Sequence, residues 1–224
     1  MIVTALVVAK APVPGLAKTR LAATIGDAAA AELAAASLLD TLEAVSAADV
    51  DHRVVALTGI LADAARAEEL TRALASFTVI AQRGDGLGER LANAHADAAT
   101  GGAVLQIGMD TPQVTAHILS DAAAQLGSSD VIGPAEDGGW WALGLRDPAM
   151  ARALLSVPMS EPSTGTDTRA ALTAAGAALV ALEELRDVDF ETDLDPVSRV
   201  CASNSRFRIA VDRIRTKRDF EYVT

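Results

Sequence analysis

The sequence is poor in cysteine, in aromatic residues and in positive charge, and each shortage excludes a class of protein. Its one cysteine, Cys201, excludes an internal disulfide and a zinc site built from several cysteines. Aromatic residues make up 3% of the chain, and alanine supplies much of the 50% hydrophobic fraction. This composition favours helices packed closely on a sheet over a sandwich with an aromatic core. The formal net charge of −11 would repel a polyanion, so no nucleic-acid partner is expected.

Long hydrophobic runs are also lacking. No apolar run approaches the roughly 20 residues that a membrane span needs, so no membrane partner is expected. The first residues, MIVTALVVAKAPVPG, have no basic segment before them and no small-residue cleavage site after them. We therefore interpret them as a first strand. Together with the single cysteine, these features predict a cytoplasmic protein.

Apolar strands alternate with helical patterns along most of the chain. Strands are expected at 2–9, 52–58, 78–81, 103–107, 131–133, 140–145 and 178–182, and helices at 27–48, 60–74, 115–126 and 167–175, with a further helix ending near residue 99. This alternation predicts βαβ units and an α/β fold with a mostly parallel sheet. Because no Pro/Ser-rich linker divides the chain, we expect one domain over residues 1–204, followed by an Arg-rich C-terminal tail over residues 205–224.

The stretch AVLQIGMDTP, residues 103–112, carries the first candidate site. Its apolar run stops at Gly108 and delivers one carboxylate, Asp110, into a turn closed by Pro112. Ligands of parallel sheets bind just beyond the carboxyl ends of the strands, where Asp110 is expected to lie. The alternative is that Asp110 merely caps the helix that begins near Thr115.

The first loop, KAPVPGLAK at residues 10–18, combines cations with glycine. Lys18 and Arg20 lie two residues apart, and Gly15 lets the backbone approach a ligand and expose its N–H groups. Together these features suit a phosphate. The spacing is not that of a Walker A loop, and the alternative is a pair of surface cations beside a Pro/Gly turn.

Three glycines, Gly84, Gly86 and Gly88, follow the third strand and open a helix. They imitate a dinucleotide fingerprint, but its third glycine would fall on Glu89, so a Rossmann dehydrogenase is rejected. A Gly-rich loop lying against a nucleotide remains one interpretation, with Arg90 reaching a phosphate. A plain turn is the other.

The fourth loop, PAEDGGWWALGL, places Asp137 before two glycines and the two tryptophans of the chain. Consecutive glycines usually mark unusual backbone angles or close backbone approach. Strand alternation sends one of Trp140 and Trp141 inward and the other toward the cleft. The alternative is a core tryptophan beside a lid tryptophan.

An acidic turn, RDVDFETDLD, follows the last predicted strand and precedes a helix. Hard divalent cations take carboxylate and phosphate oxygens together, so a carboxylate here can complete a site with Asp110. Helix capping is the alternative for Asp193 and for Asp187. His52, His95 and His117 have no recognised catalytic spacing, and His95 and His117 are read as satisfied structural histidines on helices.

Taken together, these loops resemble the DUF2064 family, also called selenodomain-associated transferase 1, within the GT-A-type nucleotide-diphospho-sugar transferase superfamily. The matching segments are AKAPVPGLAKTRLA (9–22), GDGLGERL (84–91), GMDTP (108–112), IGPAEDGGWWALGL (132–145) and, weakly, DVDFETDL (187–194). The likeness extends to about residue 200. The chain departs from the family where it has Thr111 for a frequent cysteine, Trp140 for a tyrosine, and His95 for an apolar or aromatic residue.

The resemblance implies a single-domain, GT-A-like (Rossmann-like) three-layer sandwich with a nucleotide over the first loop. The implied catalytic residues are Asp110, Lys18 and Asp137. Nucleotide contacts are implied for Lys10, Pro14, Gly15, Lys18, Arg20, Gly84, Gly88 and Arg90, and acceptor contacts for Asp137, Gly138, Gly139 and Trp141. Asp110 stands at the metal-binding acid of the DxD-type motif. Because GMDTP holds one acid rather than two, Asp189 or Asp137 is needed as a partner to hold Mg²⁺ or Mn²⁺.

The expected function is a metal-dependent transferase that uses an activated nucleotide. Its donor is a nucleoside triphosphate in the nucleotidyltransferase version and a nucleotide-sugar in the glycosyltransferase version, and its acceptor is a small molecule. The alternative is a non-catalytic nucleotide-binding protein, either a sensor or a partner subunit. The sequence leaves a homodimer open.

Overall fold

A seven-stranded sheet forms the middle of the structure, in the order β3-β2-β1-β4-β6-β5-β7. The computed structural model describes residues 1–221. The strands are β1 (Val3–Lys10), β2 (His52–Thr58), β3 (Thr78–Ala81), β4 (Ala103–Ile107), β5 (Asp130–Pro134), β6 (Trp140–Leu145) and β7 (Leu179–Ala181). All run parallel except β6, which is antiparallel to its neighbours β4 and β5. The predicted α/β fold with a mostly parallel sheet is confirmed.

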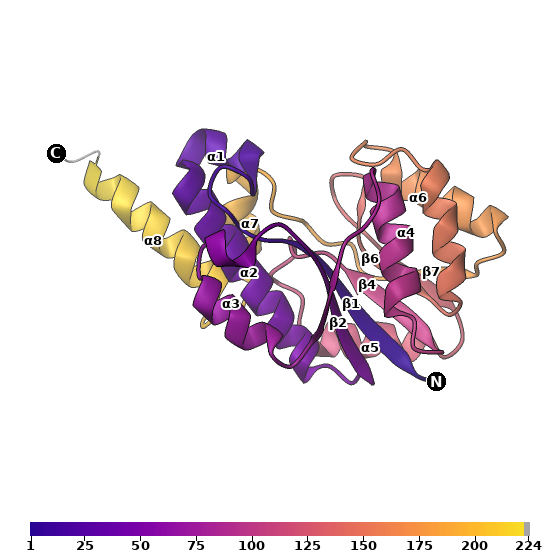
Figure 1. Cartoon of the computed structure of the whole chain (residues 1–224). Coiled ribbons are helices and arrows are strands. Elements are labelled where there is room, and N and C mark those ends of the chain that lie inside the picture. The colour runs from indigo at the N-terminus through magenta and orange to yellow at the C-terminus, as the bar shows by residue number, and fades with distance from the viewer. Residues whose placement is uncertain (222–224) are drawn as a thin grey trace.

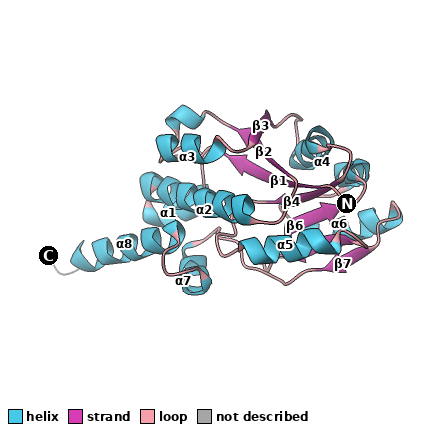
Figure 2. Cartoon of the chain, turned by 90° about the horizontal axis from the view of Figure 1, so that it is seen from below, coloured by secondary structure: helices cyan, strands magenta, loops and turns pink. Residues whose placement is uncertain are grey.

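Helices cover both faces of this sheet, which gives three layers (Figure 1). On one face lie α2 (Asp27–Ala47), α3 (Ala67–Leu74) and α5 (Ala116–Gln125), and Figure 2 shows α2 beside α5. On the other face lie α4 (Leu87–Ala98), η2 (Pro148–Ser156) and α6 (Thr164–Ala174). The other helices, α1 (Thr19–Ile25), α7 (Glu191–Val200) and α8 (Arg206–Glu221), form a cluster with α2. No helix within residues 1–221 is long and apolar enough to cross a membrane.

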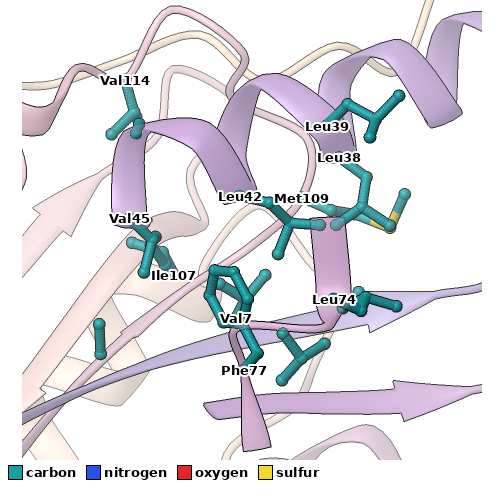
Figure 3. Close-up of a cluster of buried hydrophobic side chains, with 14 of the residues drawn as sticks. Val7, Leu38, Leu39, Leu42, Val45, Leu74, Phe77, Ile107, Met109 and Val114 are labelled. Atoms are coloured by element: carbon teal, nitrogen blue, oxygen red, sulfur yellow. The ribbon is translucent and has the colours of Figure 1, made fainter. Parts of the chain in front are cut away.

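The alternation of side chains along the central strands divides the core between these layers. On β4 every residue is buried, as expected for a parallel strand covered on both faces. Ile107 packs with Val7 beneath α2 (Figure 3), whereas Val104 packs with Leu6 beneath α4. Gln106 follows Val104 by two positions and therefore shares its face. This polar side chain enters the core beneath α4.

The α2 helix is buried on two sides, because its alanines are small enough for close packing against both the sheet and other helices. Its second side contacts the first turns of α8, where Phe207, Ala210 and Val211 are buried. The arginine that begins α8, Arg206, pairs with acids of α2 and α3, including Asp40 at 3.3 Å and Glu69 at 3.0 Å. The segment expected as a tail therefore packs on the body at its start. The division of the chain at residue 204 stays a prediction.

Several helices differ from the pattern read in the sequence. The helix expected at 60–74 begins only at Ala67, after a short 3₁₀ turn at Leu61–Asp63. Arg66 precedes it with φ 53°, a left-handed conformation that interrupts a helix, and Nε of Arg66 lies 2.7 Å from Glu32 Oε1. The helices α1 and η2 had not been expected, because they are short or carry few periodic apolar positions.

Candidate active site

The candidate site is a cleft at the carboxyl ends of the central strands, with a volume of about 1040 Å³. Its walls come from the loop after β4, the turn between β5 and β6, the start of α4, the loop before α6 and the acidic segment before α7. A smaller cavity of about 270 Å³ lies beside the first loop and shares Arg20, Asp110 and Asp189 with the cleft. The loops after β1, β4 and β5 thus meet at one edge of the sheet.

Lys18 lies at the junction of the first loop and the two acidic segments. Its backbone is left-handed, with φ 50° and ψ 49°, and it immediately precedes α1. Its ammonium nitrogen lies 2.9 Å from Asp110 Oδ1 and 2.8 Å from Asp189 Oδ1, and its side chain is 10% exposed. Burial by itself lowers the pKa of Lys18, but the two carboxylates outweigh burial and raise that pKa above its ordinary value. The ammonium is therefore a fixed positive charge between two acids.

Asp189 also binds a second cation. Arg20 reaches its other oxygen at 3.1 Å and lies over the ring of Phe190, with 5.6 Å between the guanidinium carbon and the ring centroid. Burial raises the pKa of Asp189, but Lys18 and Arg20 oppose it and hold that pKa below the ordinary value. Asp193 accepts hydrogen bonds from the backbone N–H groups of Asp189 and Phe190 at 3.1 and 2.8 Å, which confirms its predicted capping role.

Asp110 is held beside this cluster and does not cap the next helix. The hydroxyl of Thr115 accepts the hydrogen bond from the backbone N–H of Ile118, so the capping alternative for Asp110 is wrong. The carbonyl of Asp110 instead accepts from the backbone N–H of Val188 at 3.0 Å, which ties the acidic segment to the loop after β4. Gln113 adds a second tie by donating from Nε2 to the carbonyl of Arg186 at 2.6 Å.

The carboxylates of this cluster have the chemistry to hold a divalent cation. Asp110 and Asp189 each direct one oxygen at the same ammonium, so together they already hold a single cation. Asp110 Oδ1 is buried and, although it contacts the ammonium, it has no partner in hydrogen-bond geometry within the described part of the chain. Carboxylate oxygens are the donors that Mg²⁺ and Mn²⁺ prefer. The two acids fit such an ion, whereas residues 1–221 contain no group of three acidic, histidine or cysteine side chains placed to hold a metal.

Asp187 is a further acid of the site, for which helix capping was the alternative in the sequence. It lines the cleft, and Asp193 caps the start of α7. Burial, followed by the charges of Asp137 and Asp189, raises the pKa of Asp187 to about 6. The sequence did contain a signal: the apolar Val188 separates two acids spaced two apart, and this alternation directs both acids to the same side of an extended segment.

The glycines after Asp137 are explained by close backbone packing. Gly138 has φ 90°, and a Cβ atom there would lie 2.1 Å from the carbonyl oxygen of Pro162. The carbonyl of Gly138 accepts from the N–H of Gly165 at 2.8 Å, and the N–H of Gly139 donates to Asp137 Oδ1 at 2.8 Å. This turn therefore joins the loop before α6 and leaves Asp137 exposed at the mouth of the cleft.

The two tryptophans take the opposite sides that strand alternation predicts. Trp141 is 3% exposed, belongs to the core beneath α2, and donates its indole N–H to the carbonyl of Glu183 at 3.0 Å. Trp140 is half-buried on the α4 side and donates its indole N–H to the hydroxyl of Thr168 at 3.2 Å. Both border the cleft, but the predicted acceptor contact was placed on Trp141, the one that the core largely covers.

The glycine-rich loop before α4 is not brought to the cleft. A Cβ atom on Gly88 would lie 2.5 Å from the carbonyl oxygen of Leu154, so this glycine permits α4 to pack on η2. Gly84 has φ 125° and packs against Glu89, whose carboxylate accepts from the N–H of Asp85 at 2.9 Å. Neither glycine borders the cleft, and neither does Arg90. Nucleotide contacts from Gly84, Gly88 and Arg90 stay a prediction, and the geometry favours the plain-turn alternative.

The rest of the first loop borders the smaller cavity. Lys10 lines it and donates from its ammonium to the carbonyl of Leu16 at 2.7 Å. Gly15 adopts φ 77°, which justifies a glycine there, and it packs near Asp27. Pro14 is exposed and borders neither cavity. Of the predicted nucleotide set, the structure thus gathers Lys10, Lys18 and Arg20.

Solved structures with the same fold include transferases of nucleotide chemistry. A "putative nucleotide-diphospho-sugar transferase" from Desulfovibrio desulfuricans G20 is 25% identical, with a TM-score of 0.82 over 98% of this chain and 96% of that chain. CMP:2-keto-3-deoxy-manno-octonic acid synthetase complexed with CTP is 12% identical, with a TM-score of 0.56 over 88% and 97%. Rv0371c from Mycobacterium tuberculosis H37Rv, in complex with manganese, is 16% identical, with a TM-score of 0.52 over 88% and 98%.

The family itself is shown by the sequence. No curated protein matches the chain. The family model described as "Uncharacterized protein conserved in bacteria (DUF2064)" matches residues 41–161, which is more than half of the chain. The matched region includes GDGLGERL, GMDTP and IGPAEDGGWWALGL, three of the five segments on which the resemblance rested. The chain therefore belongs to the DUF2064 family, and its fold is that of the GT-A-type nucleotide-diphospho-sugar transferases.

Proposed function

We propose that the protein is a metal-dependent transferase that uses an activated nucleotide donor. One observation carries this proposal: two cations of the first loop and two carboxylates from distant segments meet at the carboxyl edge of the sheet, between a small cavity and a large one. Such an edge is where α/β sheets bind ligands. The likeness to a nucleotide-diphospho-sugar transferase and to a synthetase complexed with CTP supports a nucleotide donor.

The chemistry proposed for the cations is neutralisation of phosphate charge. Lys18 is a permanent cation in a largely buried position, and Arg20 adds a flexible guanidinium that is 59% exposed. Transfer to an acceptor leaves a diphosphate or pyrophosphate with growing negative charge. Fixed positive groups aimed at that charge stabilise the transition state. Lys18 and Arg20 would do this in both the glycosyltransferase and the nucleotidyltransferase version.

Asp110 and Asp189 are proposed to hold Mg²⁺ or Mn²⁺ alongside the donor phosphates. The ion would neutralise phosphate oxygens and orient the donor when bound. The carboxylate pair supports this assignment, and so does the likeness to a protein solved in complex with manganese. Lys18 contacts the same two oxygens, so the ammonium must move toward the phosphates for both cations to fit.

The acceptor is proposed to enter the large cleft, past Asp137 and Asp187. These two acids border the cleft, and they lie close enough for the charge of Asp137 to raise the pKa of Asp187. An acceptor hydroxyl or phosphate bound there faces the donor phosphates at Lys18. The cytoplasmic location expected from the sequence stays a prediction.

A thermal-shift panel tests the proposal. Nucleoside triphosphates and nucleotide-sugars are each measured with Mg²⁺, with Mn²⁺ and with chelator. A donor at about 100 times its Kd should stabilise the protein by roughly 2.7 kcal/mol, which raises the melting temperature by roughly 5 to 10 °C. A shift with one donor class selects the version of the reaction. Absence of any shift in folded protein contradicts the proposal.

Two variants test whether the thermal shift arises from donor binding at Lys18. Lys18→Gln should abolish it, whereas Arg83→Gln should retain it, because Arg83 pairs with Asp97 away from the cleft. Radiolabelled donor and a panel of acceptors then report turnover. Binding that persists with no turnover for any acceptor would instead support the non-catalytic nucleotide-binding alternative.

A further inference from the structure

The ion pair between Arg20 and Asp189 has a buried apolar residue beside each of its partners in the sequence. Leu21 follows Arg20 in α1, and Val188 precedes Asp189 in the acidic segment. These two apolar side chains are 0% and 2% exposed, and both belong to one buried cluster with side chains of α2, α7 and α8. The first loop and the acidic segment, which supply the opposite charges, are therefore anchored in the same apolar cluster.

The direction of the acids follows from this anchoring. Asp187 and Asp189 both border the cleft, whereas Val188 between them is turned into the apolar cluster, which is the alternation of an extended segment. The backbone N–H of Val188 donates to the carbonyl of Asp110 at 3.0 Å. A shift of Val188 would therefore move Asp189 relative to Asp110, and Lys18 lies between these two acids.

The start of α8 supplies the bulkiest side chain of this cluster. Phe207 is 0% exposed and is the largest fully buried side chain among the described residues. Ala210 and Val211, one turn further along α8, are also buried in the cluster. The helix begins beside α2, as Figure 1 shows. The segment that the sequence presents as an Arg-rich tail thus contributes to the packing that supports the charged loops.

The position of Phe207 is fixed by polar contacts between α8 and the preceding layers. Asp40 of α2 accepts hydrogen bonds from the backbone N–H groups of Arg206 and Phe207 at 3.0 and 2.9 Å, so α2 supplies the cap of α8. The guanidinium of Arg206 pairs with Asp40 at 3.3 Å and with Glu69 of α3 at 3.0 Å. These contacts hold the first turn of α8, and with it the aromatic ring, against the body of the protein.

We propose that Phe207 is a positioning residue for the candidate active site: its ring fixes the apolar cluster that holds Lys18 and Arg20 of the first loop against Asp189. Removal of a fully buried aromatic side chain leaves a cavity into which the surrounding segments relax. An ion pair weakens as its atoms separate and water enters between them. The role in group transfer rests on the proposed function, whereas the effect on the ion pairs rests on the packing alone.

The test measures the Lys18 ammonium directly, by NMR of lysine side chains in the full chain without nucleotide or metal. The chain has three lysines, and loss of one signal in Lys18→Met assigns Lys18. Hydrogens that are bonded and shielded from water exchange with it slowly, so the Lys18 ammonium should exchange at least about tenfold more slowly than that of the exposed Lys10. Phe207→Ala should remove most of this difference.

Two further variants at the same position grade the effect. Phe207→Val, a smaller truncation, should give an intermediate exchange rate and decides the question where Phe207→Ala does not fold. Phe207→Leu keeps most of the apolar volume and should restore slow exchange.

Leu126→Ala is the matched control, because Leu126 is 0% exposed but belongs to a different buried cluster, with Val131 of β5. It should lower the melting temperature as well, yet leave the exchange of the Lys18 ammonium unchanged. Once a donor is identified, kcat should fall about tenfold or more in Phe207→Ala and stay within about twofold in Leu126→Ala. This comparison separates positioning of the site from a general loss of stability.

Three results would overturn the inference: slow exchange of the Lys18 ammonium retained in folded Phe207→Ala or Phe207→Val, an equal increase of exchange in Leu126→Ala, or fast exchange already in the wild-type protein. The exchange measurements involve no nucleotide and no turnover, so they stand whatever the nucleotide panel shows. Conversely, a panel without any thermal shift contradicts the transferase proposal and leaves the exchange rates untouched.

Discussion

The two ends of the cleft satisfy their polar groups in opposite ways. At the first loop, Lys18 and Arg20 face Asp110 and Asp189, so each charge already has an opposite charge within about 3 Å. On the α4 side, Gln106 and His95 are buried, and neither Oε1 of Gln106 nor the ring nitrogens of His95 have a partner in hydrogen-bond geometry among the described residues. A ligand at the first end must therefore compete with existing ion pairs, whereas the unpartnered atoms at the second end lie beneath the surface of the cleft. Polar groups held in ion pairs and buried polar atoms without a partner therefore differ in what they cost and in what a ligand can do for them.

The largest expected effect is the loss of turnover when the buried cation of the charged end, Lys18, is removed. Lys18→Met removes the ammonium from between two acids and leaves a phosphate without its buried cation. Loss of one such group lowers turnover about 10²- to 10³-fold. The measurement is kcat with the donor identified by thermal shift. Arg83→Met, whose guanidinium pairs with Asp97, is the control and should change kcat less than about threefold. Near-normal turnover in Lys18→Met would contradict the assigned role.

A second prediction concerns the stability of the protein in acid, which depends on the buried His95. His95 has a folded pKa of about 4 against 6.5 in the unfolded chain. Between these values the unfolded state binds a proton and the folded state does not, so stability is fully present above about pH 6.5 and falls as the pH drops toward 4. The loss reaches about 3 kcal/mol. Urea unfolding at pH 7 and pH 4.5 should show most of this loss, and His95→Leu should remove it.

The control for acid sensitivity is His117, a histidine on α5 that is exposed and pairs with Asp121. His117→Leu should keep the full pH dependence of the wild-type protein. An equal loss of stability in the wild-type protein and in His95→Leu would mean that other groups titrate and that His95 is not the buried neutral base described above.

A third prediction concerns the affinity of Asp110 and Asp189 for a metal ion. Because Lys18 contacts the oxygens proposed for Mg²⁺ or Mn²⁺, Lys18→Met should expose them and bind Mn²⁺ about tenfold more tightly than the wild-type protein, or about 1.4 kcal/mol. Electron paramagnetic resonance of free Mn²⁺ measures this. Adding Asp189→Asn to Lys18→Met should cancel the gain. Equal affinity in all three proteins would remove Asp110 and Asp189 from the metal assignment.

The smallest expected effect is that of Arg20→Gln on stability. The side chain of Arg20 is mostly exposed, and its ion pair with Asp189 is screened by water. We expect the free energy of unfolding to fall by less than about 1 kcal/mol, and by less still in 0.5 M salt. Donor affinity should nevertheless decrease. A loss of stability above 2 kcal/mol would show that Arg20 is structural.

Local patterns predicted the central elements well. The strands at 52–58, 78–81 and 140–145 coincide with β2, β3 and β6, because short apolar segments bounded by turn residues define them. Asp110 and Lys18 were selected from their positions after strands, and the structure brings them within 2.9 Å. For Asp187 the sequence left helix capping open, because an acid before a helix can cap it, and the structure shows that Asp193 is the cap.

What escaped prediction depends on packing between distant segments. Gly88 looked like a phosphate-loop glycine, but its neighbour is the carbonyl of Leu154, 66 residues away in the sequence. Phe207 lies in a charged, Arg-rich segment, yet α2 buries it. His95 was expected to be satisfied, and it is buried without a partner in the part of the chain that the structure describes. Nothing local in the sequence distinguishes these outcomes.

The sequence by itself determined the α/β fold, the family and the loops at the edge of the sheet, because backbone periodicity and turn residues act over a few positions. Only the tertiary structure decided that Lys18 lies between Asp110 and Asp189, that Trp141 belongs to the core, and that the polar Gln106 is buried at the wall of the cleft. These outcomes follow from chain segments up to 171 residues apart meeting at one edge. Which side chains pair and which are buried depends on how these distant segments pack together, so no single segment determines it.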